Sequence, residues 1–143
     1  MKQEGATLVE TLVVLAILAI LSSLAGPNLQ TIRSHAYLNS VTEELAADLR
    51  FARQLATTHR HRVLVAFDVE QQTIETQFVR GGTVHHRYHY ANKGVVIDKP
   101  NVESGIVFHS SGRSATATTI RLHNSDGETR QITVGITGRV RVQ

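Results

Sequence analysis

The chain has 143 residues, no cysteine and a net charge of +3 at pH 7. The lack of cysteine excludes a disulfide-stapled scaffold, a thiolate zinc site and a cysteine nucleophile. Without a long N-terminal helix of about 50 residues, roughly 90 remain, which is enough for one small domain and too few for two.

An apolar segment dominates the start of the chain. Every residue from 12 to 21 is Leu, Val, Ala or Ile, and with its flanks the segment forms about 20 residues, or about 30 Å of helix, enough to span a bilayer. Glu10 lies inside it with no basic residue within helical reach. Because an ionised carboxylate in hydrocarbon costs at least about 2.5–3.5 kcal/mol, Glu10 indicates a function that needs a positive partner from elsewhere.

A secretory signal peptide is one alternative, with Lys2 as its basic region. The apolar segment contains Glu10 and is longer than the usual signal segment of about 7 to 15 residues, and residues 22–26 make a poor cleavage site. We therefore expect a membrane anchor, either a plain signal anchor or one with a dedicated processing site.

Residues 1–27 resemble the N-terminus of type IV pilins and of the pseudopilins of type II secretion. They comprise a short basic leader ending in Gly5, an apolar segment with Glu10 at its fifth position, and Pro27 at its twenty-second. The resemblance implies that a prepilin peptidase cleaves after Gly5 and methylates the new N-terminal amine, on Ala6. It also implies that Glu10 neutralises that amine on a neighbouring subunit during assembly, with Pro27 in the same helix. Ala6 departs from the family, which usually has Phe there.

The helical pattern continues beyond Pro27. Apolar residues recur at spacings of three and four between residues 38 and 56, and charged residues fall largely on other faces. We expect one helix from about Thr7 to Thr58, kinked or locally melted near Gly26 and Pro27, because proline removes a helical hydrogen bond. The first half would lie in the membrane and later in the core of the filament, and the second half would pack on the globular domain.

After residue 61 the apolar period changes to two, which predicts strands at 62–67, 72–80, 84–90, 94–97, 106–108, 118–122, 129–134 and 138–142. Asp126-Gly127 is a hairpin signal, because glycine accepts positive φ. The expected fold class is α+β, a long helix packed on a small antiparallel sheet or sandwich. We expect a leader at 1–5, a transmembrane and filament-core helix at 6–27, an amphipathic helix at 28–60 and a β domain at 61–143.

The order of the last strands, with Gly112 and the Asp126-Gly127 turn between them, resembles the GspH/FimT branch of minor pilins and pseudopilins, which implies the pilin fold. FimT-like minor pilins of DNA-uptake pili carry a C-terminal Gly-Arg-x-Arg motif implicated in DNA binding. Residues 138–141 match it with Gly138, Arg139 and Arg141.

The resemblance implies a structural subunit without enzymatic activity, cofactor or metal. It would sit in the bacterial inner membrane as a single-pass protein, with its C-terminal domain outside the cytoplasm, before assembly into a filament. The expected partners are other pilin or pseudopilin subunits, prepilin peptidase, membrane lipid and the DNA backbone. The implied function is in a type IV pilus, in assembly and in DNA uptake for natural transformation (competence); the alternative is a GspH-like pseudopilin of type II secretion.

The arginine pair also has a physical reading of its own. In a strand, Arg139 and Arg141 would share one face about 7 Å apart, close to the phosphate spacing of a nucleic-acid strand, while Val140 and Val142 enter the core. Phosphate contacts suffice for sequence-independent binding. Any half-buried terminal strand alternates in this way, however, and edge charges also discourage strand addition. Both readings stay open on the sequence alone.

Other constellations are weaker. The histidines at 59, 61, 85, 86 and 89 invite a metal reading, but no carboxylate lies at a usual ligand spacing, so we expect them to face solvent. Residues 58–62 form a basic knot between helix and sheet, either a solvated linker or an extension of a basic surface. Ser110, Ser111 and Asp126 with a histidine could form a triad on paper, without the context of a nucleophile turn.

The N-terminal motif generates a first prediction. We expect the mature protein to begin at Ala6 with a methylated amine, because the peptidase is expected to cleave after Gly5. Intact-mass analysis of the membrane-extracted protein checks this. A mature form that starts at any other residue would contradict it.

Overall fold

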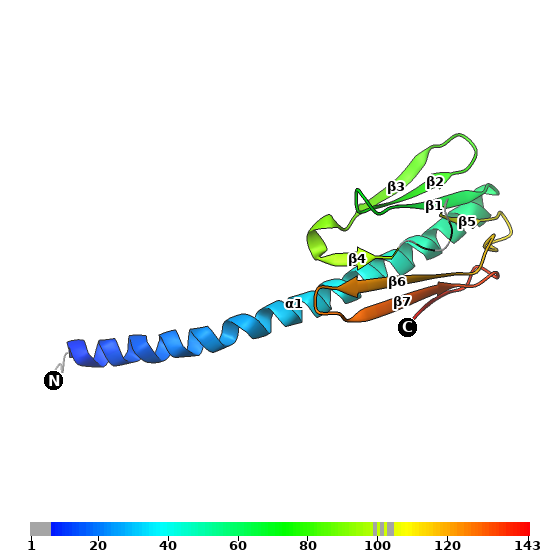
Figure 1. The fold of residues 1–143 in the computed structure, drawn as a ribbon. Helices are drawn as coiled ribbons and strands as arrows, with labels where there is room; N and C mark the ends of the chain where they lie inside the picture. The colour runs from blue at the N-terminus through cyan, green and yellow to red at the C-terminus, as the bar shows by residue number, and fades with distance from the viewer. Residues whose placement is uncertain (1–6, 99, 101, 103–104) are drawn as a thin grey trace, which may run out of the picture. The chain divides into compact units, whose positions relative to one another are not determined.

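The computed structural model describes residues 7–98, 100, 102 and 105–143, without the side chains of residues 24–29. It divides into two compact units, Met1–Arg33 and Ser34–Gln143. Helix α1, Leu8–His59, contributes to both and begins and ends within one residue of the predicted bounds (Figure 1). The helical assignment continues through Gly26 and Pro27, so the predicted local melting does not occur there.

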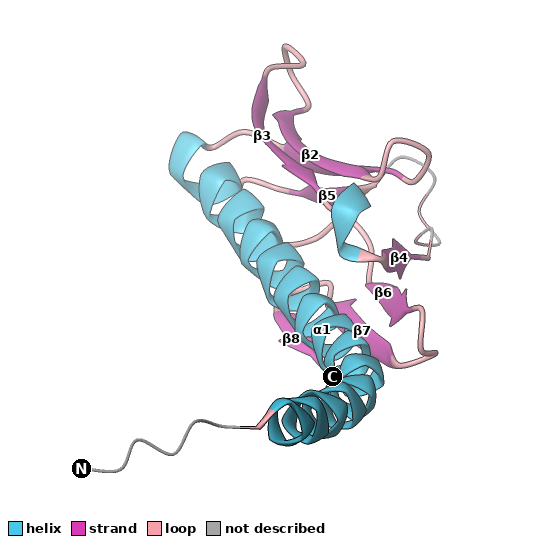
Figure 2. Ribbon diagram, turned by 90° about the vertical axis from the view of Figure 1, so that its left-hand side faces the viewer, coloured by secondary structure: helices cyan, strands magenta, loops and turns pink. Residues whose placement is uncertain are grey.

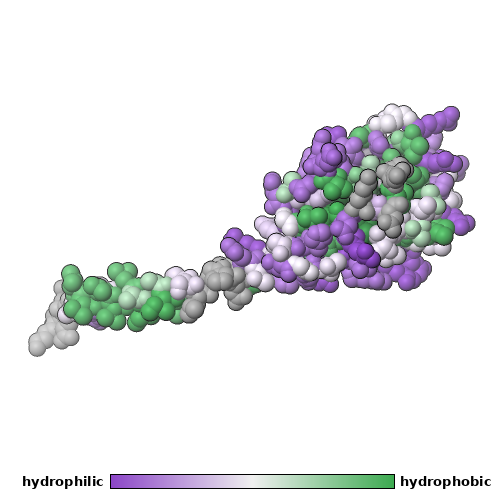
Figure 3. Space-filling model, viewed as in Figure 1, coloured by the Kyte–Doolittle hydropathy of each residue, from purple (hydrophilic) through white to green (hydrophobic). Residues whose placement is uncertain are grey.

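In the first unit, the described apolar side chains of α1 face outward. Leu8, Leu12, Leu15 and Ile20 are all more than half exposed, and Figure 3 shows hydrophobic side chains over the visible face of this part. Across the residues that the structure describes, no helix is both long and apolar enough to cross a membrane. Residue 6 and the side chains of residues 24–27, which belong to the predicted span, lie outside the described part of the chain.

The second unit contains two antiparallel four-stranded sheets. Their strands are β1 (Val63–Asp68), β2 (Thr73–Phe78), β3 (Val84–His89), β4 (Val95–Ile97), β5 (Ile106–Phe108), β6 (Thr118–Asn124), β7 (Thr129–Val134) and β8 (Val140–Val142), with a 3-10 turn, η1 (Ala91–Lys93), before β4. The first sheet has the order β3-β2-β1-β5 and the second β4-β6-β7-β8. Both lie on the same side of the C-terminal half of α1 (Figure 2). The predicted α+β class, a helix packed on antiparallel strands, is confirmed.

A single hydrophobic core joins the helix to both sheets. From α1 the fully buried side chains include Leu38, Val41, Leu45 and Leu49, spaced at three and four as the sequence predicts. The sheets contribute the alternate residues of their strands, Val63, Val65, Ile74, Ile106, Phe108, Ile120, Leu122, Ile132 and Val134. Burying each large side chain contributes about 1.5–3 kcal/mol, so this shared core holds the unit together.

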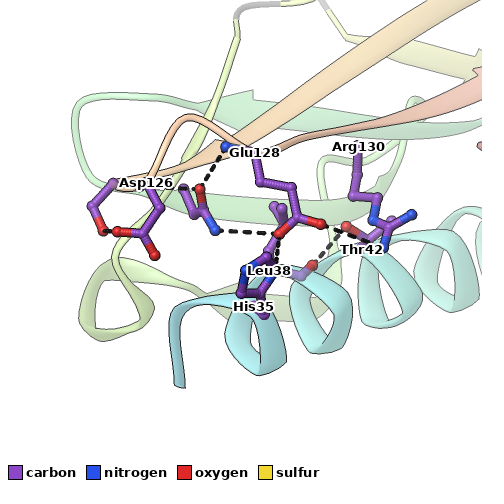
Figure 4. A network of polar contacts seen from close by, with 8 residues as sticks. His35, Leu38, Thr42, Asp126, Glu128 and Arg130 are labelled. Carbon is purple, nitrogen blue, oxygen red and sulfur yellow. Dashed lines mark hydrogen bonds and ion pairs between the residues drawn. The ribbon is translucent and has the colours of Figure 1, made fainter. Parts of the chain in front are cut away.

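Polar contacts tie α1 to the hairpin of β6 and β7 (Figure 4). Asn124 accepts hydrogen bonds from the backbone N–H of Asp126 at 3.1 Å and of Glu128 at 2.9 Å, which closes the predicted turn. The Glu128 carboxylate pairs with His35 of α1 and lies 3.6 Å from Arg130 of β7. The hairpin is therefore held against one side of the helix by a polar side-chain contact as well as by the core.

A second network ties α1 to the other sheet. Lys93 donates to the Glu44 carboxylate at 2.9 Å and to the Tyr88 hydroxyl at 3.0 Å, and its ammonium lies 5.2 Å from the Tyr88 ring centre. Burial opposes ionisation of Glu44, but hydrogen bonds with Tyr88 and Lys93 outweigh it and lower its pKa. Burial, with the hydrogen bond to Glu44, raises the pKa of Tyr88 to about 12.

The start of β8 is fixed by two glycines and one arginine. Gly138 ends the β7–β8 turn with φ +74°, and its N–H donates to the Gly135 carbonyl at 2.8 Å. A Cβ at Gly138 would overlap the Gly112 carbonyl oxygen and lie 3.1 Å from Arg53 Nε. Arg53 of α1 donates to the same Gly112 oxygen at 3.0 Å. The helix, the loop after β5 and the approach to β8 therefore meet at one point.

This junction predicts that Gly138→Ala is strongly destabilising. Left-handed strain of about 1–2 kcal/mol combines with overpacking of about 1–3 kcal/mol, so the free energy of unfolding should fall by about 2 to 5 kcal/mol. Gly127→Ala is the matched control, because Gly127 also has positive φ but nothing within 4 Å of an added Cβ. Denaturant unfolding of both variants should show the larger loss at Gly138; equal losses would contradict the close packing.

The contacts of Tyr88 with Glu44 and Lys93 predict that the Tyr88 hydroxyl loses its proton at a higher pH than an ordinary tyrosine. Because the pKa of Tyr88 is raised from 10.0 to about 12 in the folded chain, its contribution to stability is complete below pH 10 and is lost as the pH rises through about 12. Glu44→Gln removes the neighbouring negative charge, so the pKa of Tyr88 should fall. NMR of ring-labelled tyrosine, with Tyr88→Phe to assign the signal, measures this. An unchanged titration in Glu44→Gln would show that the contact does not form.

Candidate functional site

The predicted N-terminal site residues lie at the start of α1. Gly5 and Ala6 are outside the described residues, as is the side chain of Pro27. Glu10 is exposed in the first turn, and its backbone N–H donates to the Thr7 hydroxyl at 3.3 Å. Thr7 and Glu10 have the spacing of a helix capping box, and an acidic side chain in the first turn complements the helix dipole. Glu10 therefore also helps the helix to begin, a role that the sequence analysis missed.

Glu10 also borders a surface groove of the first unit. With Thr11, Val14 and Leu15 it lines a volume of about 450 Å³ that is mostly apolar. An acidic group beside an apolar groove suits a partner that brings both hydrophobic surface and a positive charge.

The C-terminal site residues lie at the edge of the second sheet. Val140 and Val142 are half-buried and pack against the core, whereas Arg139 and Arg141 are exposed. This is the alternation that the sequence predicts. Strand β8 pairs with β7 on one side only, with Val134 opposite Val140 and Thr133 opposite Arg141. The arginines therefore project from the outer face of an edge strand.

The two arginines share one depression, the β8 hollow. It has a volume of about 390 Å³ and is lined by Thr133, Gly135, Thr137, Arg139 and Arg141. Neither arginine forms an ion pair within the described ranges. Two guanidinium groups beside two threonine hydroxyls offer several donors and no competing carboxylate, which is the chemistry of an anion site.

The structure adds one cation to this face. Arg121 is exposed on β6, opposite Gln131 of β7 and two strands from β8. Adjacent strands lie about 4.8 Å apart, so Arg121 is within roughly 15 Å of Arg141. Arg121 comes to lie beside Arg139 and Arg141 only through the pairing of β6 with β7 and of β7 with β8, which the sequence alone does not reveal.

Gly138 belongs to the predicted site through its motif, but in the structure it has a packing role. That role depends on contacts with Gly112 and Arg53, and no local sequence signal marks either residue.

The histidines pack against each other and against Phe78 near the end of α1. His59, His61 and His85 are exposed, and their ring centres lie 5.5, 5.9 and 4.7 Å from that of Phe78. In the part of the chain that the structure describes, no three His, Cys, Asp or Glu side chains are grouped to hold a metal ion.

The triad considered above is not assembled. Ser110 and Ser111 are exposed in the loop after β5, whereas Asp126 lies in the β6–β7 turn and receives a hydrogen bond there from Ser125 at 3.4 Å. No hydrogen bond joins either serine to Asp126 among the described residues.

Two protein families match the chain. The prokaryotic N-terminal methylation motif matches residues 1–26. The family described as type II transport protein GspH matches residues 41–138. No curated protein matches this sequence.

Solved structures share the fold at low sequence identity. The type IV minor pilin FimU of Pseudomonas aeruginosa is 18% identical, with a TM-score of 0.66 over 78% of this chain and 92% of that chain. The minor pseudopilin EpsH of the Vibrio cholerae type 2 secretion system is 14% identical, with a TM-score of 0.63 over 74% of this chain and 95% of that chain. Both support the pilin fold.

The family also defines the general role. GspH-type proteins are structural subunits and not enzymes, and they assemble with other pilin subunits after processing by prepilin peptidase. The methylation motif indicates a prepilin that is anchored in the inner membrane before assembly. The chain therefore belongs to the GspH family, as a minor pilin or pseudopilin of a type IV pilus or a type II secretion system.

Proposed function

We propose that this chain is a minor pilin of a type IV pilus that binds DNA through Arg139 and Arg141 and contributes to pilus assembly and natural transformation. The observation that carries the proposal is the pair of exposed arginines in the β8 hollow, which form no ion pair among the described residues. Their guanidinium groups are free to meet phosphate, and Thr133 and Thr137 offer hydroxyl donors beside them.

The geometry suits the DNA backbone better than the bases. Arg139 directly precedes β8 and Arg141 lies within it. Two residues of extended chain span about 7 Å, so the arginines can engage neighbouring phosphates of one strand. A guanidinium binds phosphate with paired hydrogen bonds. Contacts to phosphate carry no information about base sequence, so the proposed binding is independent of sequence.

The assembly role rests on the N-terminal residues. We assign cleavage to the Gly5–Ala6 bond, methylation to Ala6, and subunit contact to Glu10 with Pro27 in the same helix. The groove beside Glu10 supports this assignment, because it combines a carboxylate with apolar walls. A neighbouring N-terminal amine would supply the charge that the carboxylate needs, and its apolar helix would cover the groove.

A pseudopilin of type II secretion is the second candidate. It is favoured by the family match, whose description is a type II transport protein over residues 41–138. In this role Arg139 and Arg141 would be an outward strand face that discourages strand addition. Deleting the gene separates the candidates: loss of transformation with normal protein secretion supports the pilus, and loss of protein secretion with normal transformation supports the pseudopilus.

The proposal predicts a defined loss in the double variant Arg139→Ala, Arg141→Ala. The full chain in non-ionic detergent should bind unrelated DNA duplexes with similar affinity. Each neutralised phosphate contributes about 0.9 to the slope of log affinity against log salt, so the variant should lower the slope by up to about 1.8. Folding should change by no more than about 0.5 kcal/mol per site, because the side chains are exposed.

The control is Arg50→Ala, Arg87→Ala, which removes the same charge from an exposed position of α1 and from β3 of the other sheet. It should leave the slope nearly unchanged. Lysine at positions 139 and 141 should retain most of the slope, because it keeps the charge. Its affinity should lie between those of the unsubstituted chain and the alanine variant, because it loses the planar fork. A slope equal to that of the unsubstituted chain in the folded Arg139→Ala, Arg141→Ala variant would reject the DNA site.

A further inference from the structure

A second cationic hollow lies where α1 meets the first sheet. This junction hollow has a volume of about 360 Å³ and is lined by Arg60, His61, Arg62, Val79, Arg80 and Ser110. No carboxylate lines it, and none of its three arginines forms an ion pair across the described residues. The basic knot in the sequence therefore does not act only as a linker: the fold joins it to Arg80 from the β2–β3 turn and to a hydroxyl from the loop after β5.

The arginines are held by a defined frame. The backbone carbonyl of Arg62 accepts a hydrogen bond from Val79 at 3.0 Å, which fixes the two segments side by side. His61 packs edge-on against Phe78, which is itself packed against the core. Arg60 follows the helix with φ +54°, a left-handed conformation that usually falls to glycine at this position. The arginines thus come from two segments, the linker between α1 and β1 and the β2–β3 turn, which a backbone hydrogen bond holds side by side.

The helix end offers a simpler reason for Arg60. A cation at a helix C-terminus complements its carbonyl groups, which carry roughly half a negative charge. The same partial charge would repel an anion. It accounts for one arginine, however, and three full positive charges exceed it severalfold. Arg62 and Arg80 therefore need another explanation.

The junction hollow lies close to the β8 hollow. Ser110 lines the first, and two residues later Gly112 packs against Gly138, which precedes Arg139. Two residues span at most about 7 Å, and neighbouring Cα atoms are about 3.8 Å apart, so Ser110 and Arg139 lie within roughly 20 Å. That distance corresponds to about six base pairs of duplex. Arg53 lies at Gly112, between the two hollows.

We propose that the junction hollow is a second phosphodiester-binding site that engages the same DNA duplex as the β8 hollow. This inference rests on the proposed function and deepens it. Arg62 and Arg80 bind phosphate with paired hydrogen bonds, and the Ser110 hydroxyl adds a donor. A duplex across both sites would release counterions at each, so affinity and its salt dependence would reflect two clusters.

The test measures salt dependence by fluorescence anisotropy, with the full chain in non-ionic detergent and a labelled duplex of about 24 base pairs, longer than the span of both sites. Arg62→Ala, Arg80→Ala should lower the log-log slope by up to about 1.8. Combined with Arg139→Ala, Arg141→Ala, the losses should add. Arg62→Lys, Arg80→Lys should retain most of the slope, because lysine keeps the charge. Arg50→Ala, Arg87→Ala is the control for net charge.

The outcomes separate the two sites. A larger fall in slope for Arg62→Ala, Arg80→Ala than for the control supports DNA binding at the junction hollow. If the Arg139 and Arg141 variant is unchanged in the same experiment, the β8 site is rejected, and with it the engagement of one duplex by both hollows. An unchanged slope, with a loss for the Arg139 and Arg141 variant, overturns the junction hollow alone. Absence of DNA binding by the unsubstituted chain overturns both. Impaired filament incorporation with an unchanged slope would assign the arginines to a contact with acidic groups of another subunit, and would also overturn the proposal.

If alanine at these positions impairs folding, measured by thermal unfolding, glutamine takes its place. Arg62→Gln, Arg80→Gln keeps a polar side chain with part of the aliphatic stem and leaves the backbone contact of Arg62 with Val79 in place, while it removes the guanidinium and its charge. The same fall in slope is expected.

Discussion

The burial of one face of α1 is the interaction on which the second unit depends. Neither sheet has a core of its own: the inward residues of β1, β2 and β5 and those of β6 and β7 pack into the same cluster as Leu38, Leu45 and Leu49. A sheet with one apolar face must bury that face against another element. Because the helix covers both, their outer faces and edges are left for solvent and for partners. The exposed arginines of β8 and the junction hollow are consequences of this arrangement.

Much of the fold follows from periodicity. The apolar spacing of three and four between residues 38 and 56 predicted the buried face of α1. The change to a period of two predicted the strands, and for most of them the predicted ends lie within one to two residues of the observed ends. The Asp126-Gly127 turn was also predictable, because glycine permits the positive φ found there. What periodicity cannot supply is the partition of strands between sheets. The chain crosses from β3 to β4 and back to β5, so sheet membership depends on long-range contacts.

The sites were predictable to different degrees. The outward direction of Arg139 and Arg141 follows from alternation with Val140 and Val142, and the structure shows it. The role of Gly138 does not follow, because its neighbour Gly112 is 26 residues away in sequence and meets it only in the folded chain. The junction hollow was visible only as a basic run at residues 58–62. Arg80 and Ser110 join it through strand pairing that the run itself does not encode.

Residues 138–141 are subject to two different constraints. Gly138 is constrained by packing, since any side chain there would collide with the backbone of the loop at Gly112. The side chains of Arg139 and Arg141 are exposed and make no contact on which folding depends. Their chemistry can therefore drift while the scaffold persists. The charge of this edge can therefore change through substitutions at residues 139 and 141 without any change in how the loop, the helix and the last turn pack together.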